Sequence, residues 1–284
     1  MSSEIGLDHI EEHELKSILH KMKSGATALG GEVGKDVLVQ AMMKHIGSTD
    51  SELRDRLIYS SFYYFIIEDN QLEHELLDEL LDHCLSDLLF KGIGENGTDT
   101  VFTRAFTTLL IALILGRDNE DDFLSEQTVH TVKEKLIRYM NAEKDLRGFV
   151  PEKGWAHSIA HAADAFDELA KNPKLGRKSY PDLLKPLWNK IFVSTSVYVH
   201  EEDERIITPI ITMMENGLET KEVVTLLQQM PEELSIQKEQ LEEENYWILV
   251  FNCKTFLKSF YIKAGSIPKL RPLQKSIEKC LAAI

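Results

Sequence analysis

Apolar side chains recur at helical spacing along almost the whole chain, and this pattern constrains the fold more than any other feature of the sequence. Residues 7–23, for example, place Ile10, Leu15 and Ile18 on one side of a helix. No segment alternates apolar and polar residues over the length of a strand. Only 15 glycines and 8 prolines interrupt the 284 residues, and both residue types tend to end helices. The sequence therefore predicts an all-α protein with long helices.

We expect about twelve helices, joined mostly by short connections. The expected segments are residues 7–23, 33–46, 52–65, 71–90, 100–115, 123–140, a helix that begins near Trp155, 180–197, 202–214, 220–230, 234–262 and 268–284. Helix pairs of about 35–45 residues are the unit of stacked α-solenoids. The spacing predicts a single domain over residues 1–284, with antiparallel helix pairs stacked in an α–α superhelix of the HEAT or armadillo kind. A closed helical bundle is the alternative, because no internal sequence repeat aligns.

The charge and cysteine content of the chain limit its partners and its compartment. The formal net charge is −15, whereas nucleic-acid binding requires a positive surface that displaces counterions from phosphates. Cys84, Cys253 and Cys280 have the spacing of neither a disulfide framework nor a zinc knuckle. The N-terminus lacks the basic and apolar regions of a signal peptide. We therefore expect a cytoplasmic protein with no nucleic-acid partner.

The most apolar run extends from Phe106 to Leu115 and is bracketed by Arg104 and Arg117. As a helix it would rise only about 15 Å, half the thickness of a bilayer core. The run is therefore predicted to be a helix buried in the centre of the fold, and we expect no membrane partner.

One segment, residues 145–164, differs from the rest because it concentrates polar and chemically active side chains. Its residues of interest are Asp145, Arg147, Lys153, Trp155, His157, His161 and Asp164. On a helix, His157, His161 and Asp164 cover an arc of about 60° and project from one face. The opposite face, with Trp155, Ile159, Ala162, Phe166 and Leu169, is expected to anchor this helix in the core.

Two imidazoles and a carboxylate on one helix face are ligands that Zn, Fe, Mn or Ni accept. His157, His161 and Asp164 are therefore candidate metal ligands or catalytic residues, with His161 or His157 as a general base tuned by Asp164. A metalloprotease motif would need Glu directly after the first histidine, where this chain has Ser158. The alternative is a polar stripe that faces solvent or another helix.

The loop before this helix suits an anionic ligand. Arg147 and Lys153 would supply positive charge near a helix start, with Arg104, Asp145 and Trp155 nearby. The alternative is that Arg147 pairs with Asp145 or Glu152.

Charged residues next to apolar runs point to buried ion pairs. Arg54 with Asp55, and Arg104 before the most apolar run, must each find a carboxylate or carbonyl partner if they are buried. The acidic cluster that includes Glu202 and Asp203 is expected to begin a helix, a position that favours acids. If the chain folds back, Glu202 could also face His157 and His161 as a further metal ligand or as a base.

Several of these segments resemble one known family. Asp145-Leu-Arg-Gly, Lys153-Gly-Trp-Ala-His157 and Ala160-His-Ala-Ala-Asp164 are similar to the signature of the bacterial domain of unknown function 2785. Weaker similarities are Leu53-Arg-Asp55, Val101-Phe-Thr-Arg104-Ala-Phe106 and Glu201-Glu-Asp-Glu-Arg205. The resemblance covers about residues 50–210. It implies a helical protein of mostly Gram-positive bacteria, and it implies no particular activity.

Three functions are consistent with the sequence. The leading hypothesis is a helical-repeat protein that binds a partner protein and has a polar site at residues 145–164. The second is a metal-dependent enzyme of the hydrolase type built on His157, His161 and Asp164. The third is a binder of a small anionic ligand through Arg147 and Lys153.

Overall fold

The computed structural model of this protein describes residues 10–26, 31 and 33–284, and within them the chain is almost entirely helical. The described α-helices are α1 (Glu12–Lys23), α2 (Lys35–Lys44), α3 (Ser60–Tyr63), α4 (His74–His83), α5 (Thr100–Asp121), α6 (Glu126–Ala142), α7 (Ser158–Lys171), α8 (Tyr180–Asn189), α9 (Glu202–Glu215), α10 (Thr220–Gln240), α11 (Glu243–Ser266) and α12 (Arg271–Ala283). The all-α prediction is confirmed. The first residues of the helix expected over 7–23 lie partly outside the described residues.

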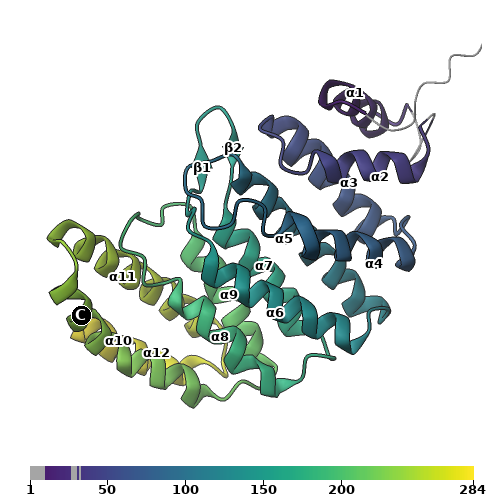
Figure 1. The fold of residues 1–284 in the computed structure, drawn as a ribbon. Helices are drawn as coiled ribbons and strands as arrows, with labels where there is room; N and C mark the ends of the chain where they lie inside the picture. The colour runs from purple at the N-terminus through teal and green to yellow at the C-terminus, as the bar shows by residue number, and fades with distance from the viewer. Residues whose placement is uncertain (1–9, 27–30, 32) are drawn as a thin grey trace, which may run out of the picture.

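A few segments depart from α-helical geometry. Wider π-helical turns occur in η1 (Glu52–Tyr59), η2 (Tyr64–Glu68) and η3 (Cys84–Leu88), and a 3₁₀ turn occurs in η4 (Arg177–Ser179). Strands β1 (Phe149–Val150) and β2 (Gly154–Trp155) form one small antiparallel hairpin. In Figure 1 the tip of this hairpin projects above α5.

Helix α5 lies in the centre of the fold, as its apolar run predicts. Within the described residues it is the one helix long and apolar enough to cross a membrane, and 89% of its most apolar stretch is buried inside the protein. Side chains on every side of α5 are buried, which is the pattern of a core helix. Large side chains of its neighbours, including Phe62 and Phe166, are fully buried with it.

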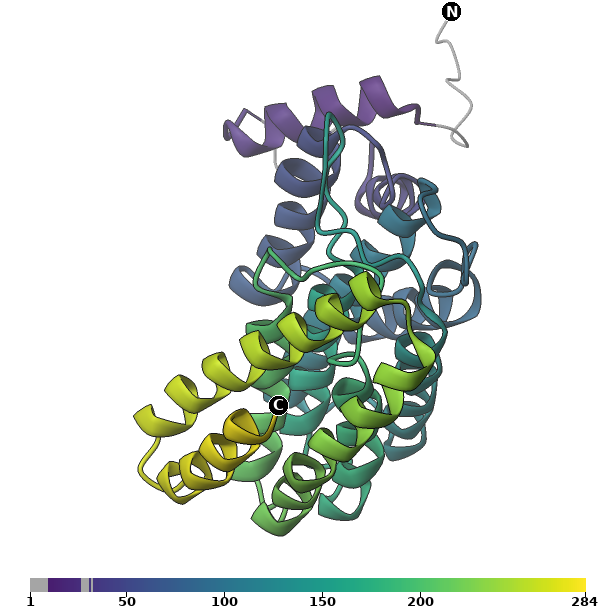
Figure 2. The ribbon, with the colours of Figure 1, turned by 90° about the vertical axis from the view of Figure 1, so that its left-hand side faces the viewer.

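Helices α5, α7 and α9 lie side by side in one row (Figures 1 and 2). Helices α5 and α7 run in the same direction, because Phe106 and Asn119 of α5 contact His161 and Glu168 of α7 in that order. Helix α9 also runs this way, because its Arg205 and Thr212 bond Asp164 and Asp167 of α7 in that order. Helices α6 and α8 pack on the neighbouring side, and α10, α11 and α12 form the C-terminal end. Parallel alternate helices are what stacked helix pairs produce. The repeated superhelix itself stays a prediction.

Helix α8 ends earlier than its sequence pattern predicts. It stops at Asn189 rather than Val197, because Asn252 of α11 holds the following loop. The Asn252 amide donates to the carbonyls of Val193 and Ser196, and its oxygen accepts from the backbone N–H of Tyr198. The last predicted residues of the helix therefore form an ordered loop that leads to α9.

The boundary between α10 and α11 also lies elsewhere than predicted. Helix α10 continues through Pro231 to Gln240, whereas the sequence led us to expect a break at this proline. Proline removes one backbone hydrogen bond and crowds the carbonyl four residues earlier. Leu227 and Leu234 are buried on either side of Pro231, so packing outweighs this cost.

Candidate functional site

The segment that is richest in polar motifs folds as a hairpin followed by a helix. Phe149 pairs with Trp155 and Val150 with Gly154, and Glu152 and Gly154 adopt positive φ in the turn. Helix α7 then begins at Ser158, not near Trp155 as predicted. Trp155 therefore lies on the hairpin and is 39% exposed, so its predicted place on the core-facing side of the helix is wrong. The other four predicted anchors, from Ile159 to Leu169, are buried as expected.

Arg54, from η1, binds the backbone of the hairpin through its side chain. Its side chain is fully buried and donates to the carbonyls of Lys153 (2.7 Å) and Trp155 (3.2 Å). The guanidinium lies over the ring of Phe102 at 4.3 Å, and its Nε is 2.8 Å from Oδ1 of Asp55. A buried guanidinium with this many partners fixes the backbone around it. The predicted buried pairing of Arg54 is confirmed.

Asp145 and Arg147 fix the start of the hairpin. The Asp145 carboxylate is fully buried and accepts from Gly97 N–H (3.0 Å) and from Arg147 Nε (2.8 Å) and Nη2 (2.6 Å). Arg147 also donates to the carbonyl of Thr98 (2.6 Å). Arg147 therefore pairs with Asp145, which is the alternative to anion binding that the sequence left open.

Lys153 and Arg104, the other predicted anion-binding cations, also face carboxylates. Lys153 donates to both carboxylate oxygens of Asp99 at 2.7 Å. Arg104 is fully buried and forms a bidentate pair with Glu143 at 2.7 and 2.9 Å, as its position before an apolar run predicts. An anionic ligand would have to displace a carboxylate from each of these cations. Their geometry favours a structural role, because Lys153 ties the hairpin to the loop that precedes α5, and Arg104 ties α5 to Glu143 in the segment that follows α6.

Four rings gather where the hairpin meets α7, and we call Phe149, Trp155, His157 and His200 the aromatic corner. Trp155 stacks on His157 with ring centroids 4.4 Å apart and an interplanar angle of 8°. Phe149 and His200 each meet the indole edge-on, at 5.1 and 5.2 Å. His157 occupies a left-handed backbone conformation (φ 50°) at the N-cap of α7, which turns its ring back towards the hairpin.

Glu202, at the start of α9, lies beneath the aromatic corner. The chain folds back as the sequence allowed, and the Glu202 Oε1 atom is 3.7 Å from His157 Nδ1 and 3.8 Å from His200 Nδ1. Burial opposes ionisation of Glu202. The His157 imidazole and the backbone N–H of His200 outweigh that effect and lower the pKa of the carboxyl group. A buried carboxylate is thus shared by two histidines.

Gly148 allows this close approach. A Cβ atom at residue 148 would collide with Nδ1 of His200 and lie 2.8 Å from Oε1 of Glu202. Only glycine leaves the space in which the loop after α8 can reach the hairpin.

His161 is buried one turn further along α7. Its ring meets Phe106 edge-on at 5.2 Å, and its centroid is 5.5 Å from that of His157. Burial, together with the neighbouring charges of His157 and Arg205, holds the pKa of His161 well below its ordinary value, so the ring is neutral at pH 7. The Nδ1 atoms of His157 and His161 are buried, and neither atom has a hydrogen-bond partner among the described residues.

Asp164 turns away from the two histidines. It forms a two-pronged pair with Arg205 of α9, in which Arg205 Nε lies 2.8 Å from Oδ1 and Nη2 contacts Oδ2. His157, His161 and Asp164 therefore do not converge on one point. Within the part of the chain that the structure describes, no three His, Cys, Asp or Glu side chains are arranged to hold a metal ion.

Sequence reasoning missed three contributors to this region. Phe149 and His200 complete the aromatic corner, and Arg205 neutralises Asp164. Phe149 lies inside the polar segment, so its place opposite Trp155 could be inferred once a hairpin is assumed. His200 is far away in sequence and carried no comparable signal, whereas Arg205 ends a segment that resembles the family but had no role assigned to it.

The segments that resemble one family in sequence meet in this region of the structure. Residues 53–55, 101–106, 145–164 and 201–205 all contribute to the hairpin or to the side chains around it. The family model described as "Protein of unknown function (DUF2785)" matches residues 89–262. The match begins later and ends further on than the segments of residues 50–210 whose motifs resemble the family. No curated protein and no solved structure matched the chain. Because the family model covers more than half of the 284 residues, the chain belongs to the DUF2785 family of proteins of unknown function.

Proposed function

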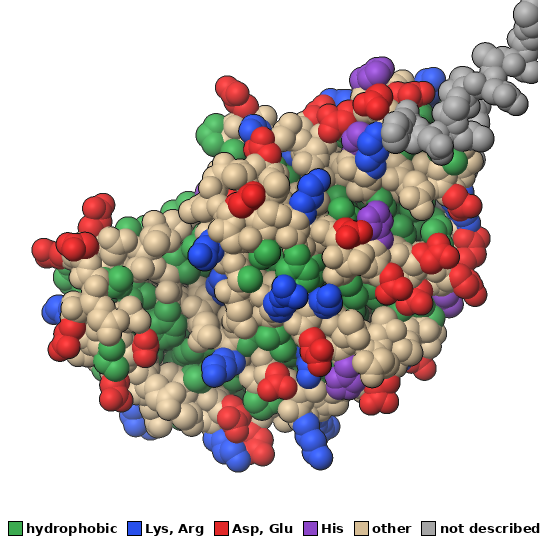
Figure 3. Space-filling model, viewed as in Figure 1, with side chains coloured by type: hydrophobic (Ala, Val, Ile, Leu, Met, Phe, Trp, Pro, Cys, Tyr) green, Lys and Arg blue, Asp and Glu red, His purple; other side chains and the backbone are tan. Residues whose placement is uncertain are grey.

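We propose that this protein is a binding protein that recognises a partner protein through the hairpin. The observation that carries the proposal is the exposure of large apolar side chains on a rigidly held element. Phe149 is 49% exposed, Trp155 is 39% exposed, and Val199, next to His200, is 67% exposed. We call these three residues the hairpin patch; Figure 3 shows hydrophobic side chains exposed at the hairpin. Apolar residues that remain exposed together typically mark interaction sites.

The rigidity of the hairpin supports this proposal. Arg54 and Asp145 bind the hairpin backbone from two sides, and His157 stacks on the indole of Trp155. A side chain that is already ordered loses little conformational entropy on binding. Tryptophan and other large aromatic residues provide much of the binding energy in protein interfaces for this reason.

Polar groups around the hairpin patch supply a rim. The Lys153–Asp99 pair is partly exposed beside the hairpin, and Arg147 and His200 are half-buried. A hydrophobic centre with a polar, solvent-accessible rim is the common anatomy of an interface. The same residues that sequence reasoning assigned to an anionic ligand thus frame a surface for a protein.

The test begins with a photo-reactive amino acid at position 149, incorporated in cells that express the protein. A second variant carries the same group at Ile262 of α11, which is 71% exposed and distant in sequence from the hairpin. We expect a discrete crosslinked partner from position 149 alone. The partner is then purified, and its affinity is measured for the wild type, Phe149→Ala and Trp155→Ala. Each substitution should weaken binding by about tenfold or more, the effect of losing an aromatic hot spot.

Ile262→Ala is the control for affinity, because it removes an exposed apolar side chain outside the hairpin patch. It should leave binding unchanged. Circular dichroism melting of each variant separates a lost contact from a lost fold. Equal affinity of the wild type and a folded Phe149→Ala/Trp155→Ala variant for the purified partner would refute the proposal.

A second candidate function is favoured by one specific observation. Within the described residues, His157 and His161 carry buried Nδ1 atoms without hydrogen-bond partners, and Glu202 lies beside His157. A divalent metal held by the two imidazoles would satisfy these atoms and could activate a water molecule; because the three side chains are not already arranged as a metal site, Glu202 would have to move to join them. Elemental mass spectrometry of the wild type and of a folded His157→Ala/His161→Ala variant decides this. Near-stoichiometric metal in the wild type alone supports the metal site, and equal metal content in the two removes it.

A further inference from the structure

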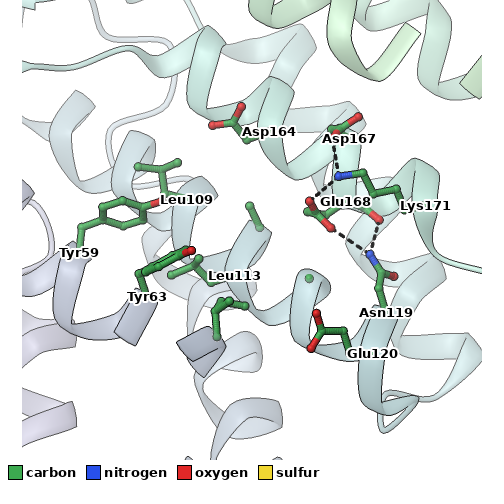
Figure 4. Close-up of a pocket in the computed structure, with 13 residues that line it drawn as sticks. Tyr59, Tyr63, Leu109, Leu113, Asn119, Glu120, Asp164, Asp167, Glu168 and Lys171 are labelled. Carbon is green, nitrogen blue, oxygen red and sulfur yellow. Dashed lines mark hydrogen bonds and ion pairs between the residues drawn. The ribbon is translucent and has the colours of Figure 1, made fainter. Parts of the chain in front are cut away.

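A second surface feature lies at the other end of α7, away from the hairpin. It is a cleft of about 550 Å³ between η1, α3, α5 and α7, shown in Figure 4. Its size is within the range of pockets that hold small organic ligands. The four residues of the aromatic corner do not line this cleft, so the cleft is a separate site.

The walls of the cleft combine aromatic and aliphatic groups. Tyr59 and Tyr63 stand on one side, opposite Glu168 and Lys171, and Leu109 and Leu113 lie between them (Figure 4). Gly116 leaves room in the floor, because an added Cβ there would meet no atom closer than the Glu168 carboxylate at 3.6 Å. The cleft thus offers aromatic faces and an apolar floor to a ligand with a carbon chain.

Negative charge exceeds positive charge around this cleft. Four carboxylates line it, from Glu120, Asp164, Asp167 and Glu168. Arg205 neutralises Asp164, and Lys171 is shared by Asp167 (2.8 Å) and Glu168 (2.7 Å). No cation of the described residues lies within ion-pair distance of Glu120. The four carboxylates of the cleft are therefore balanced by only two cations, which leaves a surplus of two negative charges.

The backbone adds to the negative potential at one end. Helices α5 and α7 run in the same direction and end at Asp121 and Lys171, so their C-terminal ends lie at the same end of the cleft. The C-terminus of a helix carries a partial negative charge that favours cations. At this end Asn119 donates to the carbonyl of Glu168, while its own Oδ1 atom is buried and accepts no hydrogen bond from the described residues.

The surroundings of the Asp164 carboxyl group act on its pKa in both directions. Burial raises its pKa, and repulsion from Asp167 and Glu168 adds to that effect although Arg205 opposes it. A bound cation would stabilise the ionised form.

We propose that this cleft binds an organic cation of the polyamine class, with primary ammonium groups joined by a short aliphatic chain. The ammonium groups would meet the carboxylates and the tyrosine faces, which attract cations through their π-electrons. The aliphatic chain would lie on the floor formed by Leu109, Leu113 and Gly116. A hydrated inorganic cation would gain nothing from such a floor, so the apolar lining favours an amine over a metal ion.

Isothermal titration calorimetry with spermidine, n-butylamine and Mg²⁺ at fixed ionic strength tests this proposal. We expect spermidine to bind at one site and about tenfold or more tighter than either other probe, since it alone combines several charges with a carbon chain. Gly116→Leu fills the floor and should weaken spermidine binding by about tenfold or more. Glu120→Gln should weaken it by about threefold, the effect of one exposed charge pair.

Glu134→Gln on α6 is the matched control, because it removes the same charge from an exposed position outside the cleft. It should change spermidine affinity less than twofold, as an exposed charge in solvent contributes little. Equal weakening by Glu120→Gln and Glu134→Gln would assign the binding to the overall negative charge and overturn the proposal. Unchanged spermidine binding by a folded Gly116→Leu variant, or no heat with spermidine at millimolar concentration, would also overturn it.

Discussion

The balance between positive and negative side chains differs between the two ends of α7. At the hairpin end, Arg54, Arg104 and Arg147 each lie within ion-pair distance of a carboxylate, and rings are left exposed. At the cleft end, carboxylates outnumber their cations around an apolar floor.

This difference shows that charge content alone does not identify a ligand site. The sequence suggests Arg104, Arg147 and Lys153 as ligands of an anion, yet the fold supplies each of them with a carboxylate partner. The surplus that could attract a ligand is negative and lies one to three turns further along the same helix. Perturbing each end separately should therefore give different results.

The largest effect is expected at the hairpin end, from Arg104→Met. Glu143 is almost completely buried, and loss of Arg104 would leave its carboxylate without the bidentate partner. Breaking a buried pair from one side typically costs about 3–5 kcal/mol. We expect urea denaturation to show a loss of this size in the free energy of unfolding, with an unchanged m-value.

Lys153→Met is the matched control, because it breaks an exposed ion pair in the same region of the molecule. Lys153 and Asp99 are both more than one third exposed, so the expected loss is about 0–1 kcal/mol. Similar losses for Arg104→Met and Lys153→Met would contradict the view that burial makes the Arg104–Glu143 pair the more important of the two for stability.

Gly154→Ala should be next in size. Gly154 has φ +78°, and a Cβ atom there would lie 2.7 Å from the Ser51 Cβ and 3.1 Å from Arg54 Nη2. The left-handed backbone alone costs a non-glycine residue about 1–2 kcal/mol, and the contact with η1 adds to that cost. We expect thermal denaturation to show a loss of about 2 kcal/mol or more. A variant as stable as the wild type would show that the hairpin is not held as tightly as its contacts indicate.

The sequence predicted those parts of the fold that depend on local pattern. Helical spacing located α5 and α7, and charges beside apolar runs correctly required partners for Arg54 and Arg104. The hairpin could not be predicted in this way, because Trp155 and Ile159 have helical spacing. What prevents the helix from starting earlier is the turn at Gly154 and the hydrogen bonds from Arg54, which comes from 99 residues away in sequence.

The cleft was equally inaccessible to sequence reasoning. Tyr63 lies among Phe62 and Phe65, which are buried, and shares their aromatic character, yet it faces the cleft. The polar stripe His157, His161 and Asp164 is predicted from the sequence to form one site. Its members instead occupy three environments, because α9 supplies Glu202 to the first and Arg205 to the third.

The pH dependence of stability should separate His161 from Asp164. The folded pKa of His161 is lowered, so the unfolded chain binds this proton at higher pH. Stability is therefore lost as pH falls below about 6.5, by at most about 1.4 kcal/mol per pH unit. In His161→Gln this part of the slope should disappear, as urea denaturation between pH 4.5 and 7.5 would show. An unchanged slope would mean that His161 titrates as it does in the unfolded chain.

Asp164 has the opposite sign. Its folded pKa is raised above 3.8, so the folded state holds this proton to higher pH than the unfolded state does. Its contribution to stability therefore grows as pH falls through that region and is lost as pH rises. Asp164→Asn should steepen the acid loss of stability where His161→Gln flattens it, and slopes of the same sign for both variants would contradict the assignment.

The smallest effect is expected from Gly116→Ala at the cleft end, and it should be a gain. Gly116 lies inside α5 at a negative φ, and the added methyl group would contact Glu168 and Ile67 at 3.6–3.8 Å, which are ordinary van der Waals distances. Alanine is favoured over glycine inside a helix by up to about 1 kcal/mol, so Gly116→Ala should raise the free energy of unfolding by roughly that amount. Gly154→Ala makes the same chemical change at the hairpin end and should lower it, because backbone conformation and space differ there. If both variants were destabilised, the floor of the cleft would be as tightly packed as the hairpin, and it would have no room for the carbon chain of a ligand.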